Sequence, residues 1–230
     1  MKTLKTKAIV LSRVNYGETD RILTVITPDL GKLRLIARGV RVIKSKLAGG
    51  IELFSVNDIS FIKGRSDVYT LTSSRLSQNY GHIIKDINRV QFGYEILKTI
   101  HKTTEDVTDK EFFNLLEFSL STLNDVRIPL DLSRIVFMSR LLAVSGHAPN
   151  LNKDNSGKIL SESSKYKFDI ETMAFYPEES GNYTANDIKF LRIVFSVEDI
   201  RLLSKIADAE SYAVRLIPLV NSMHLNHLSR

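Results

Sequence analysis

The chain has 230 residues, of which 43% are hydrophobic and 25% charged, a composition that can fill one large core or two smaller ones. It contains no apolar run long enough to cross a bilayer and no signal-peptide pattern at its start, so we expect a cytoplasmic protein. It contains no cysteine, which excludes disulfides, thiol nucleophiles and thiolate metal sites.

The formal net charge of +6 is unevenly distributed along the chain. Residues 1–80 carry 14 Lys and Arg against 6 Asp and Glu, a net charge of +8. Residues 81–230 carry 18 bases against 20 acids, a net charge of −2. This asymmetry favours a basic nucleic-acid-binding module joined to a near-neutral part that supports it or binds partners.

The first 80 residues predict a small all-β domain, because short apolar segments alternate with turn residues. The predicted strands are Ala8–Val14, Ile22–Ile26, Leu33–Ala37, Leu53–Ile62 and Val68–Leu71. Five short strands in a segment of this length favour the five-stranded oligonucleotide-binding (OB) barrel.

A basic stretch lies between Gly31 and Leu53, and no acid occurs in it before Glu52. Its bases are Lys32, Arg34, Arg38, Arg41, Lys44 and Lys46. A strand that delivers a basic loop to the rim of a barrel can follow a phosphate backbone. Tyr16 and Tyr69 could add stacking platforms for bases. The alternatives are a solvated charged face for the bases and core packing for the two aromatic rings.

From residue 82 the apolar period becomes helical, and the predicted helices span residues 83–103, 112–123, 130–145 and 209–228. We expect the first three to form a bundle against which the barrel packs. N-cap patterns begin at Thr108, Thr184 and Ser196, and Pro218 should kink the last helix.

A polar insertion, residues 147–183, separates the helices, and within it Lys167–Ile170 and Met173–Tyr176 could pair as a hairpin. The predicted fold is α+β and multidomain, with a five-stranded OB barrel at residues 1–80 and an α-helical domain at residues 81–230 that contains this insertion.

The sequence carries no enzyme signature: it lacks the phosphate-binding loop, the dinucleotide fingerprint and the nucleophile elbow. His224 and His227 could share a helix face, but no third metal ligand is nearby. Glu18 and Asp20 form an acidic pair that is better explained by holding the first hairpin than by binding a divalent ion. The sequence therefore predicts neither an enzyme nor a metal site.

The order of the motifs in the first quarter of the chain is more specific than any one of them. An apolar strand at residues 8–12 is followed by YGETDR (16–21), ILTVITPDLGKL (22–33), ARGVR (37–41) and KSKLAGGIELF (44–54). Together they closely resemble the amino-terminal domain of the RecO family of bacterial recombination mediators. Further on, Leu141-Leu142 and Gly146-His147-Ala148-Pro149 resemble more loosely the family's segment before a zinc ribbon.

The resemblance implies an OB barrel followed by a helical domain, binding to single- and double-stranded DNA, and annealing of complementary strands. It also implies displacement of single-strand-binding protein, with RecR as partner, so that RecA can load. The six bases match the family's basic segment position by position and would be the DNA contacts. In the helical domain the family binds the carboxyl-terminal tail of single-strand-binding protein, for which Arg134 and Arg140 are our candidates. The expected location is the bacterial cytoplasm, at the nucleoid.

Many members of the family carry a four-cysteine zinc ribbon after this segment. Here the probable cysteine positions hold other residues: Lys153, Ser156, Pro177 and Ser180. None of these can form a zinc-ligand set, so we expect a cofactor-free remnant of the ribbon held by its hairpin and by packing.

Three other functions fit the residues. An RNA-binding OB protein would use the same groove charge and stacking. An assembly scaffold could bind an acidic protein through the basic loop. A metal-dependent nuclease would use Glu18 and Asp20.

Overall fold

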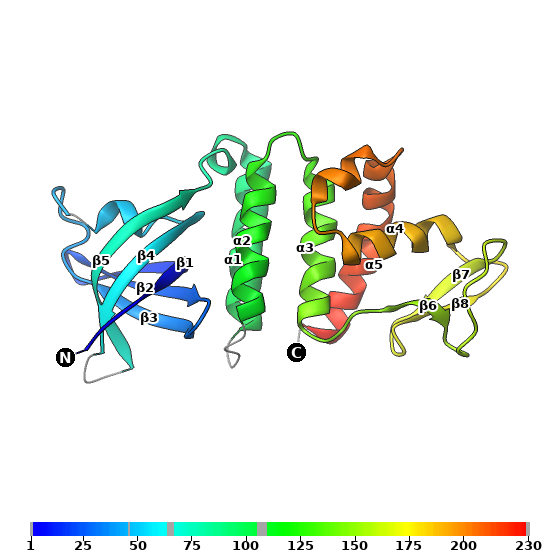
Figure 1. Ribbon diagram of the computed structural model, residues 1–230, viewed down its shortest axis with the longest axis horizontal. Helices are drawn as coiled ribbons and strands as arrows, with labels where there is room; N and C mark the ends of the chain where they lie inside the picture. Colours follow the sequence, from blue (N-terminus) through cyan, green and yellow to red (C-terminus); the bar gives the residue numbers. More distant parts are fainter. Residues whose placement is uncertain (1, 46, 64–66, 105–109, 229–230) are drawn as a thin grey trace. The chain divides into compact units, whose positions relative to one another are not determined.

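The computed structural model describes residues 2–45, 47–63, 67–104 and 110–228. The chain forms two compact units, residues 1–125 and residues 126–230, which are described separately (Figure 1). The barrel expected at residues 1–80 is one part of the first unit, which also contains two helices. No helix within the described ranges has the length and apolar character needed to span a membrane.

The amino-terminal sheet closes on itself. Its strands are β1 (Thr3–Tyr16), β2 (Asp20–Thr27), β3 (Gly31–Ala37), β4 (Ser55–Ile62) and β5 (Val68–Asn79). They are ordered β1-β2-β3-β5-β4, and β4 pairs back onto β1 (Figure 1). β3 and β5 run parallel, whereas the other four pairings are antiparallel.

Each predicted strand is present, but β5 is longer than its sequence pattern indicates. The prediction ended at Leu71, whereas β5 continues to Asn79 along β4. Its second half is polar and mostly exposed, because that part of the strand contributes backbone hydrogen bonds and few core side chains. Hydrophobic alternation therefore cannot reveal it.

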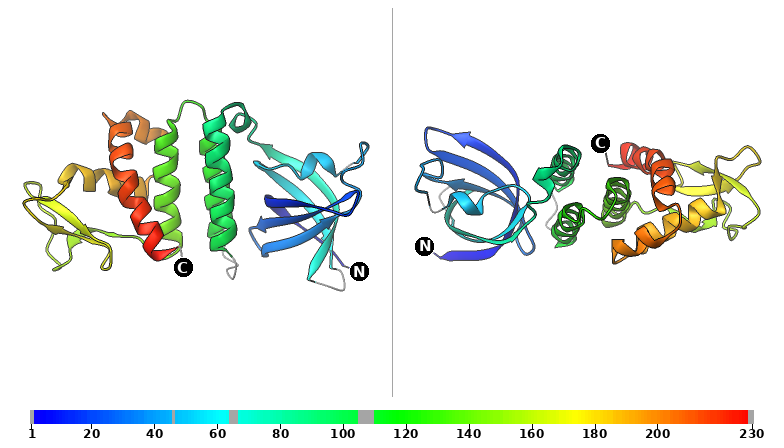
Figure 2. Two further views of the ribbon diagram at one scale, coloured as in Figure 1. Left: turned by 180° about the vertical axis from the view of Figure 1, so that it is seen from behind. Right: turned by 90° about the horizontal axis from the view of Figure 1, so that it is seen from above.

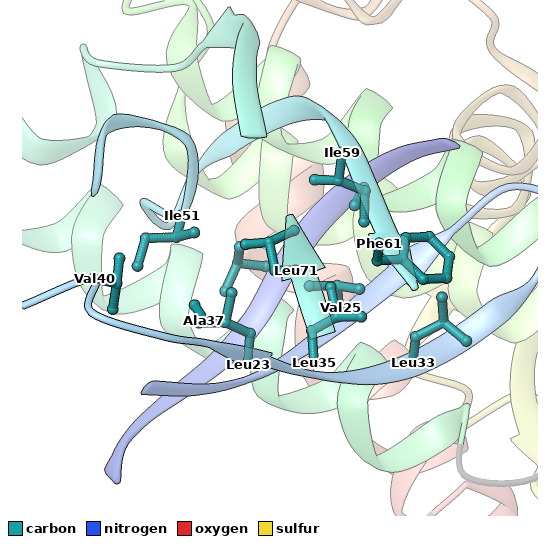
Figure 3. Close-up of a cluster of buried hydrophobic side chains, with 12 residues drawn as sticks. Leu23, Val25, Leu33, Leu35, Ala37, Val40, Ile51, Ile59, Phe61 and Leu71 are labelled. Atoms are coloured by element: carbon teal, nitrogen blue, oxygen red, sulfur yellow. The ribbon is translucent and has the colours of Figure 1, made fainter. Parts of the chain in front are cut away.

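The barrel interior is filled by apolar side chains from all five strands and from the segment after β3 (Figure 3). Phe61 and Leu35 are fully buried in it. Burying one such side chain contributes about 1.5–3 kcal/mol. In β3 the core positions alternate with outward ones, so Leu33 and Leu35 face inward while Arg34 between them is exposed.

Two helices complete the first unit: α1 (Ile87–Thr103), preceded by a short 3-10 helix, and α2 (Lys110–Asn124). The Asp86 carboxylate caps α1 by accepting hydrogen bonds from the backbone N–H groups of Asn88 and Arg89. The buried guanidinium of Arg89 donates to the Leu123 carbonyl at 2.7 Å, which joins the two helices. The capping pattern at Thr108 lies outside the described residues.

The second unit contains α3 (Leu130–Val144), α4 (Ala185–Ser196) and α5 (Ala209–His227) (Figure 2). α3 packs against both α4 and α5. The three helices predicted to form one bundle are thus divided between the units. The capping box at Thr184 is confirmed, since its hydroxyl and the Asp187 carboxylate bond reciprocally to backbone N–H groups.

The N-cap prediction at Ser196 is wrong, because Ser196 is the last residue of α4. Asp199 instead caps a 3-10 helix, Ile200–Lys205, through the backbone N–H of Arg201. Gly146 follows α3 with a positive φ of 79°, a conformation that favours glycine. Pro218 lies inside α5.

The insertion forms a small sheet ordered β6-β8-β7-β9. Its strands are β6 (Asn150–Asp154), β7 (Lys165–Asp169), β8 (Ala174–Pro177) and β9 (Tyr183–Thr184). The predicted hairpin is confirmed as the antiparallel β7–β8 pair. Phe175 is fully buried at its centre and makes edge contacts with three other aromatic rings, those of Tyr166, Phe168 and Tyr183.

Candidate nucleic-acid interface

The outer face of β3 carries the basic stretch. Arg34 is exposed there, paired in register with Thr24 of β2 on one side and Val68 of β5 on the other. Arg38 follows β3 directly and is also exposed. The alternation that buries the leucines of β3 therefore directs these two guanidinium groups to solvent.

The turn after β3 is tied to the start of β2 by one carboxylate. Asp20 Oδ1 accepts hydrogen bonds from the backbone N–H of Gly39 at 2.8 Å and from the Thr19 hydroxyl at 3.0 Å. These bonds, first that of Gly39, and the nearby Arg38 charge hold the pKa of Asp20 below its usual value. Asp20 thus has a structural role, although it ties the start of β2 to the turn after β3 rather than holding the first hairpin as expected.

A second pair of hydrogen bonds joins the same two turns. The backbone N–H of Arg41 donates to the Thr19 carbonyl at 2.9 Å, and its guanidinium donates to the Gly17 carbonyl at 3.2 Å. The turn between β1 and β2 and the turn after β3 therefore form one rim. Tyr16, 55% exposed, lies at the β1 end of this rim, opposite Asp20 in the β1–β2 register.

Three of the predicted cations are exposed and, among the described residues, have no hydrogen-bonded or ion-paired partner: Arg34, Arg38 and Lys44. They are available to phosphates without the loss of an internal contact. Lys46, the sixth predicted contact, lies outside the described residues.

Lys32 is placed differently from the other bases. Its ammonium donates to the backbone carbonyl of His101 at 3.0 Å, in the last turn of α1, and the side chain is half-buried. A cation at a helix carboxyl terminus is favoured by the helix dipole. Lys32 therefore fastens α1 to the barrel.

An apolar row lies beside the exposed cations on the outer face. Val14 pairs with Ile22, and Ile22 pairs with Ile36, so that three aliphatic side chains cross β1, β2 and β3. Val14 is 63% exposed, and the other two are half-buried. The next row along the strands contains Arg34, so apolar and cationic groups are side by side. We call this surface, with Arg38, Lys44 and Tyr16, the β2–β3 face.

Tyr69 does not belong to the β2–β3 face as a free platform. It is half-buried against the barrel core and makes an edge contact with Phe61 at 5.3 Å between ring centroids. Tyr16 is the exposed one of the two predicted aromatic residues.

The two arginines singled out in the helical part lie on α3, and both are half-buried. The Arg140 guanidinium donates to the Val197 carbonyl, which ties α3 to the residue after α4. Burial lowers the pKa of Arg140, and the Glu198 charge opposes that shift.

The probable cysteine positions do not fit a zinc ion. Lys153, Ser156, Pro177 and Ser180 supply no thiolate or imidazole, and the described residues contain no cluster of three or more metal-ligating side chains. His224 and His227 each place Nε2 against a backbone carbonyl, of Met138 at 2.7 Å and of Ile170 at 3.0 Å. A nitrogen that donates to a carbonyl is protonated and cannot ligate a metal.

A carboxylate closes the turn at the end of β6. Asp154 Oδ1 accepts three hydrogen bonds, from the N–H and hydroxyl of Ser156 and from the N–H of Lys158, all between 2.7 and 2.9 Å. These bonds, first that of the Ser156 hydroxyl, lower the pKa of Asp154. The turn that cysteines would close around a metal is closed here around a carboxylate.

Sequence reasoning missed the tether between Asp20 and Gly39 and the apolar row. Both depend on pairing between strands that the sequence does not state. A signal for part of the row was present, since Ile22 and Ile36 alternate with buried residues along β2 and β3. Val14 could not be placed in this way, because the register of β1 shifts between Val10 and Ser12.

Comparison with known proteins matches both parts of the chain to one family. Residues 1–80 match the family described as Recombination protein O N terminal, and residues 84–230 match Recombination protein O C terminal. Both descriptions name a recombination protein.

Individual relatives give the same result. The DNA repair protein RecO of Dehalococcoides mccartyi (strain CBDB1) is 30% identical over 208 residues, which cover 89% of this chain and 78% of that protein. That of Alkaliphilus metalliredigens (strain QYMF) is 33% identical over 149 residues, 64% of this chain and 60% of that protein. With both of its parts matched and a relative aligned along most of its length, the chain belongs to the RecO family of DNA repair and recombination proteins.

Proposed function

We propose that this protein is a non-enzymatic mediator of DNA repair and homologous recombination, whose OB-type barrel binds single- and double-stranded DNA. The observation that carries the proposal is the β2–β3 face: Arg34, Arg38 and Lys44 are exposed and have no hydrogen-bonded or ion-paired partner among the described residues, and Arg34 and Arg38 flank an apolar row that is partly exposed. Cations that follow a phosphate backbone, next to groups that bases can cover, suit a single strand.

The mechanism is electrostatic. Two complementary strands repel each other through their phosphates, and each neutralised phosphate reduces that repulsion and releases counterions. In a strand held mainly by its backbone on the β2–β3 face, the bases that do not contact Tyr16 or the apolar row remain available to a second strand. The barrel would therefore speed annealing without performing covalent chemistry.

The partners follow from family membership. We propose that RecR acts with this protein, and that the tail of single-strand-binding protein docks on the helical unit, so that RecA loads onto the released DNA at the nucleoid. Arg134 and Arg140 on α3 are our candidates for contacting that tail. We also propose that the insertion works without a metal, because Asp154 closes the turn at the end of β6.

The test combines binding and annealing. Arg38→Glu with Lys44→Glu should weaken binding of a labelled single-stranded oligonucleotide by at least about tenfold at low salt and slow annealing in parallel. Lys85→Glu with Lys98→Glu changes the net charge equally at exposed positions on the 3-10 helix and α1, and is the control. Wild-type binding and annealing in the Arg38/Lys44 variant would refute the proposal.

A further inference from the structure

A hollow lies on another part of the barrel surface, where β1, β4 and β5 are neighbours. It has a volume of about 600 Å³, and its lining includes three cations, Lys5, Lys7 and Arg75, and one acid, Asp58. β1 contributes to both surfaces, but Lys5 and Lys7 lie in its first half, which pairs with β4, whereas Val14 and Tyr16 lie in its second half, which pairs with β2, so this surface is distinct from the β2–β3 face. We call it the β1–β4–β5 face.

The strand register explains how the cations gather. Leu4 and Ala8 pack into the barrel core, so Lys5 and Lys7 between them point outward, and both are exposed. Lys7 is paired with Asp58 of β4, which is paired with Arg75 of β5. The neighbouring row continues from Lys5 across two serine residues, one on β4 and one on β5.

The acid at the centre does not block the surface. Asp58 bonds to Arg75 at 3.2 Å, but the two side chains are 41% and 84% exposed. Exposed ion pairs of this kind contribute little to stability because water screens them. A phosphate can therefore take the place of Asp58 beside Arg75 at small cost.

The hollow continues toward α2. An adjoining hollow of about 650 Å³ shares Lys7 with the first and is lined by hydrogen-bonding side chains, among them Gln78 of β5 and Asn114 of α2, and by the aromatic residues Tyr80 and Phe118. It contains one acid, Glu117. A chain lying along both would meet cations first and amide and hydroxyl groups next.

The chemistry of the lining favours a phosphodiester backbone over an acidic peptide. Lys5 and Lys7 are two residues apart on one strand, about 7 Å, so their ammonium groups can reach neighbouring phosphates of one nucleic-acid strand. The serine hydroxyls beside them are donors that suit phosphate oxygens. An acidic tail with an apolar end would need an aliphatic pocket, but among the described lining residues of both hollows Ile59 alone is aliphatic. The aromatic residues Tyr80 and Phe118 of the adjoining hollow also suit stacking by bases.

We propose that the β1–β4–β5 face binds a second single strand of nucleic acid, so that one protomer holds two strands at once. The inference rests on the proposed function, which places the first strand on the β2–β3 face. Holding both strands on one barrel would turn the encounter of two repelling polyanions into a rearrangement on a single protein.

The experiment counts oligonucleotides on each protomer. Two non-complementary single strands with different dyes are mixed with the full chain at low salt, and sedimentation velocity at both dye wavelengths gives their number per protomer. The wild type should bind two strands, and Lys5→Glu with Lys7→Glu should bind one. The first strand should keep its affinity within about twofold in that variant, and annealing should slow by about tenfold or more.

The outcomes separate the two proposals. Loss of the second strand in the Lys5/Lys7 variant, but not in the matched Lys85/Lys98 variant, supports a site on the β1–β4–β5 face. One strand per protomer in the wild type, two in the Lys5/Lys7 variant, or equal loss in both variants overturns it while leaving the β2–β3 face intact. Absence of any DNA binding overturns both proposals, and binding of polyglutamate in place of DNA at Lys5 and Lys7 assigns the face to an acidic protein.

Discussion

The carboxylate of Asp20 accepts a hydrogen bond from the backbone N–H of Gly39 at 2.8 Å, although 19 residues separate them. Asp20 begins β2, and Gly39 lies in the turn after β3, between Arg38 and Arg41. Gly39 has a positive φ of 63°, so the turn has an unusual backbone conformation that the carboxylate stabilises. One acid thus fixes the turn that carries Arg38 and Arg41.

Removing this tether should weaken DNA binding more than folding. Asp20→Ala should reduce affinity for a single-stranded oligonucleotide by about fivefold, because the arginines lose a fixed position. Fluorescence anisotropy measures the affinity, and thermal unfolding measures stability. An affinity increase, as expected from removing a negative charge alone, would contradict the positioning role.

The lowered pKa of Asp20 sets the pH range in which its hydrogen bonds stabilise the fold. A carboxyl whose pKa is lower folded than unfolded contributes stability fully above the unfolded value of about 3.9 and loses it as pH falls through the folded value. The difference in free energy of unfolding between the wild type and Asp20→Ala should therefore stay constant from about pH 5 to pH 8 and shrink only in stronger acid. Thermal unfolding across this pH range measures it.

Lys32 should behave as a structural residue. Lys32→Met should lower the free energy of unfolding by about 1 kcal/mol, because the His101 carbonyl loses a charged donor. The salt dependence of DNA binding should not change. For a single strand, a slope reduced by about 0.7 would instead assign Lys32 to a phosphate.

Tyr16 and the apolar row should act through stacking and contact with bases. Tyr16→Ala should cost about 1–3 kcal/mol of binding free energy per stacked base, with the salt slope unchanged because no cation is lost. Tyr69→Phe is the matched control, since Tyr69 packs against the core. Equal losses in both variants, or none in Tyr16→Ala, would exclude Tyr16 as a platform.

Chelators should not change the stability of the insertion. EDTA should leave the melting temperature unchanged, whereas Asp154→Ala should speed hydrogen exchange at the amides of Ser156 and Lys158, which lose their acceptor. Mass spectrometry of the exchanged peptides measures this. Unfolding by EDTA would show that a metal holds the ribbon.

His224 should make the helical unit sensitive to mild acid. Burial lowers its pKa, and the bond to the Met138 carbonyl offsets part of that shift. Because the unfolded state takes up the proton more readily, stability should fall as pH drops below the unfolded value of about 6.5 and stop falling below the folded value. His224→Gln should remove this dependence, as followed by thermal unfolding between pH 7.5 and pH 5. A pH dependence equal to that of the wild type would place its origin elsewhere.

The elements with a clear apolar period were predictable from the sequence, and those held by polar contacts were not. The strands that contain Leu23, Leu35 and Phe61 follow from alternation, whereas the second half of β5 is polar and is defined by its ladder with β4. Ser196 resembled an N-cap but ends α4, because Asp199 three residues later caps the next helix.

The candidate interface was likewise predictable only in part. The charge run located the basic surface, but the sequence could not show which bases find partners inside the unit. Lys32 bonds to α1, whereas Arg34 on the same strand face stays exposed. That difference depends on where α1 ends relative to β3, a tertiary relationship that local patterns do not contain.

The salt dependence of single-strand binding tests the central claim most directly. Each cation that contacts a phosphate adds about 0.7 to the slope of log affinity against log salt concentration for single strands. Replacing Arg34, Arg38 and Lys44 with glutamine should therefore flatten the wild-type slope by about 2, while Lys32→Met leaves it unchanged. An unaltered slope in the triple variant would show that the β2–β3 face does not hold the DNA backbone.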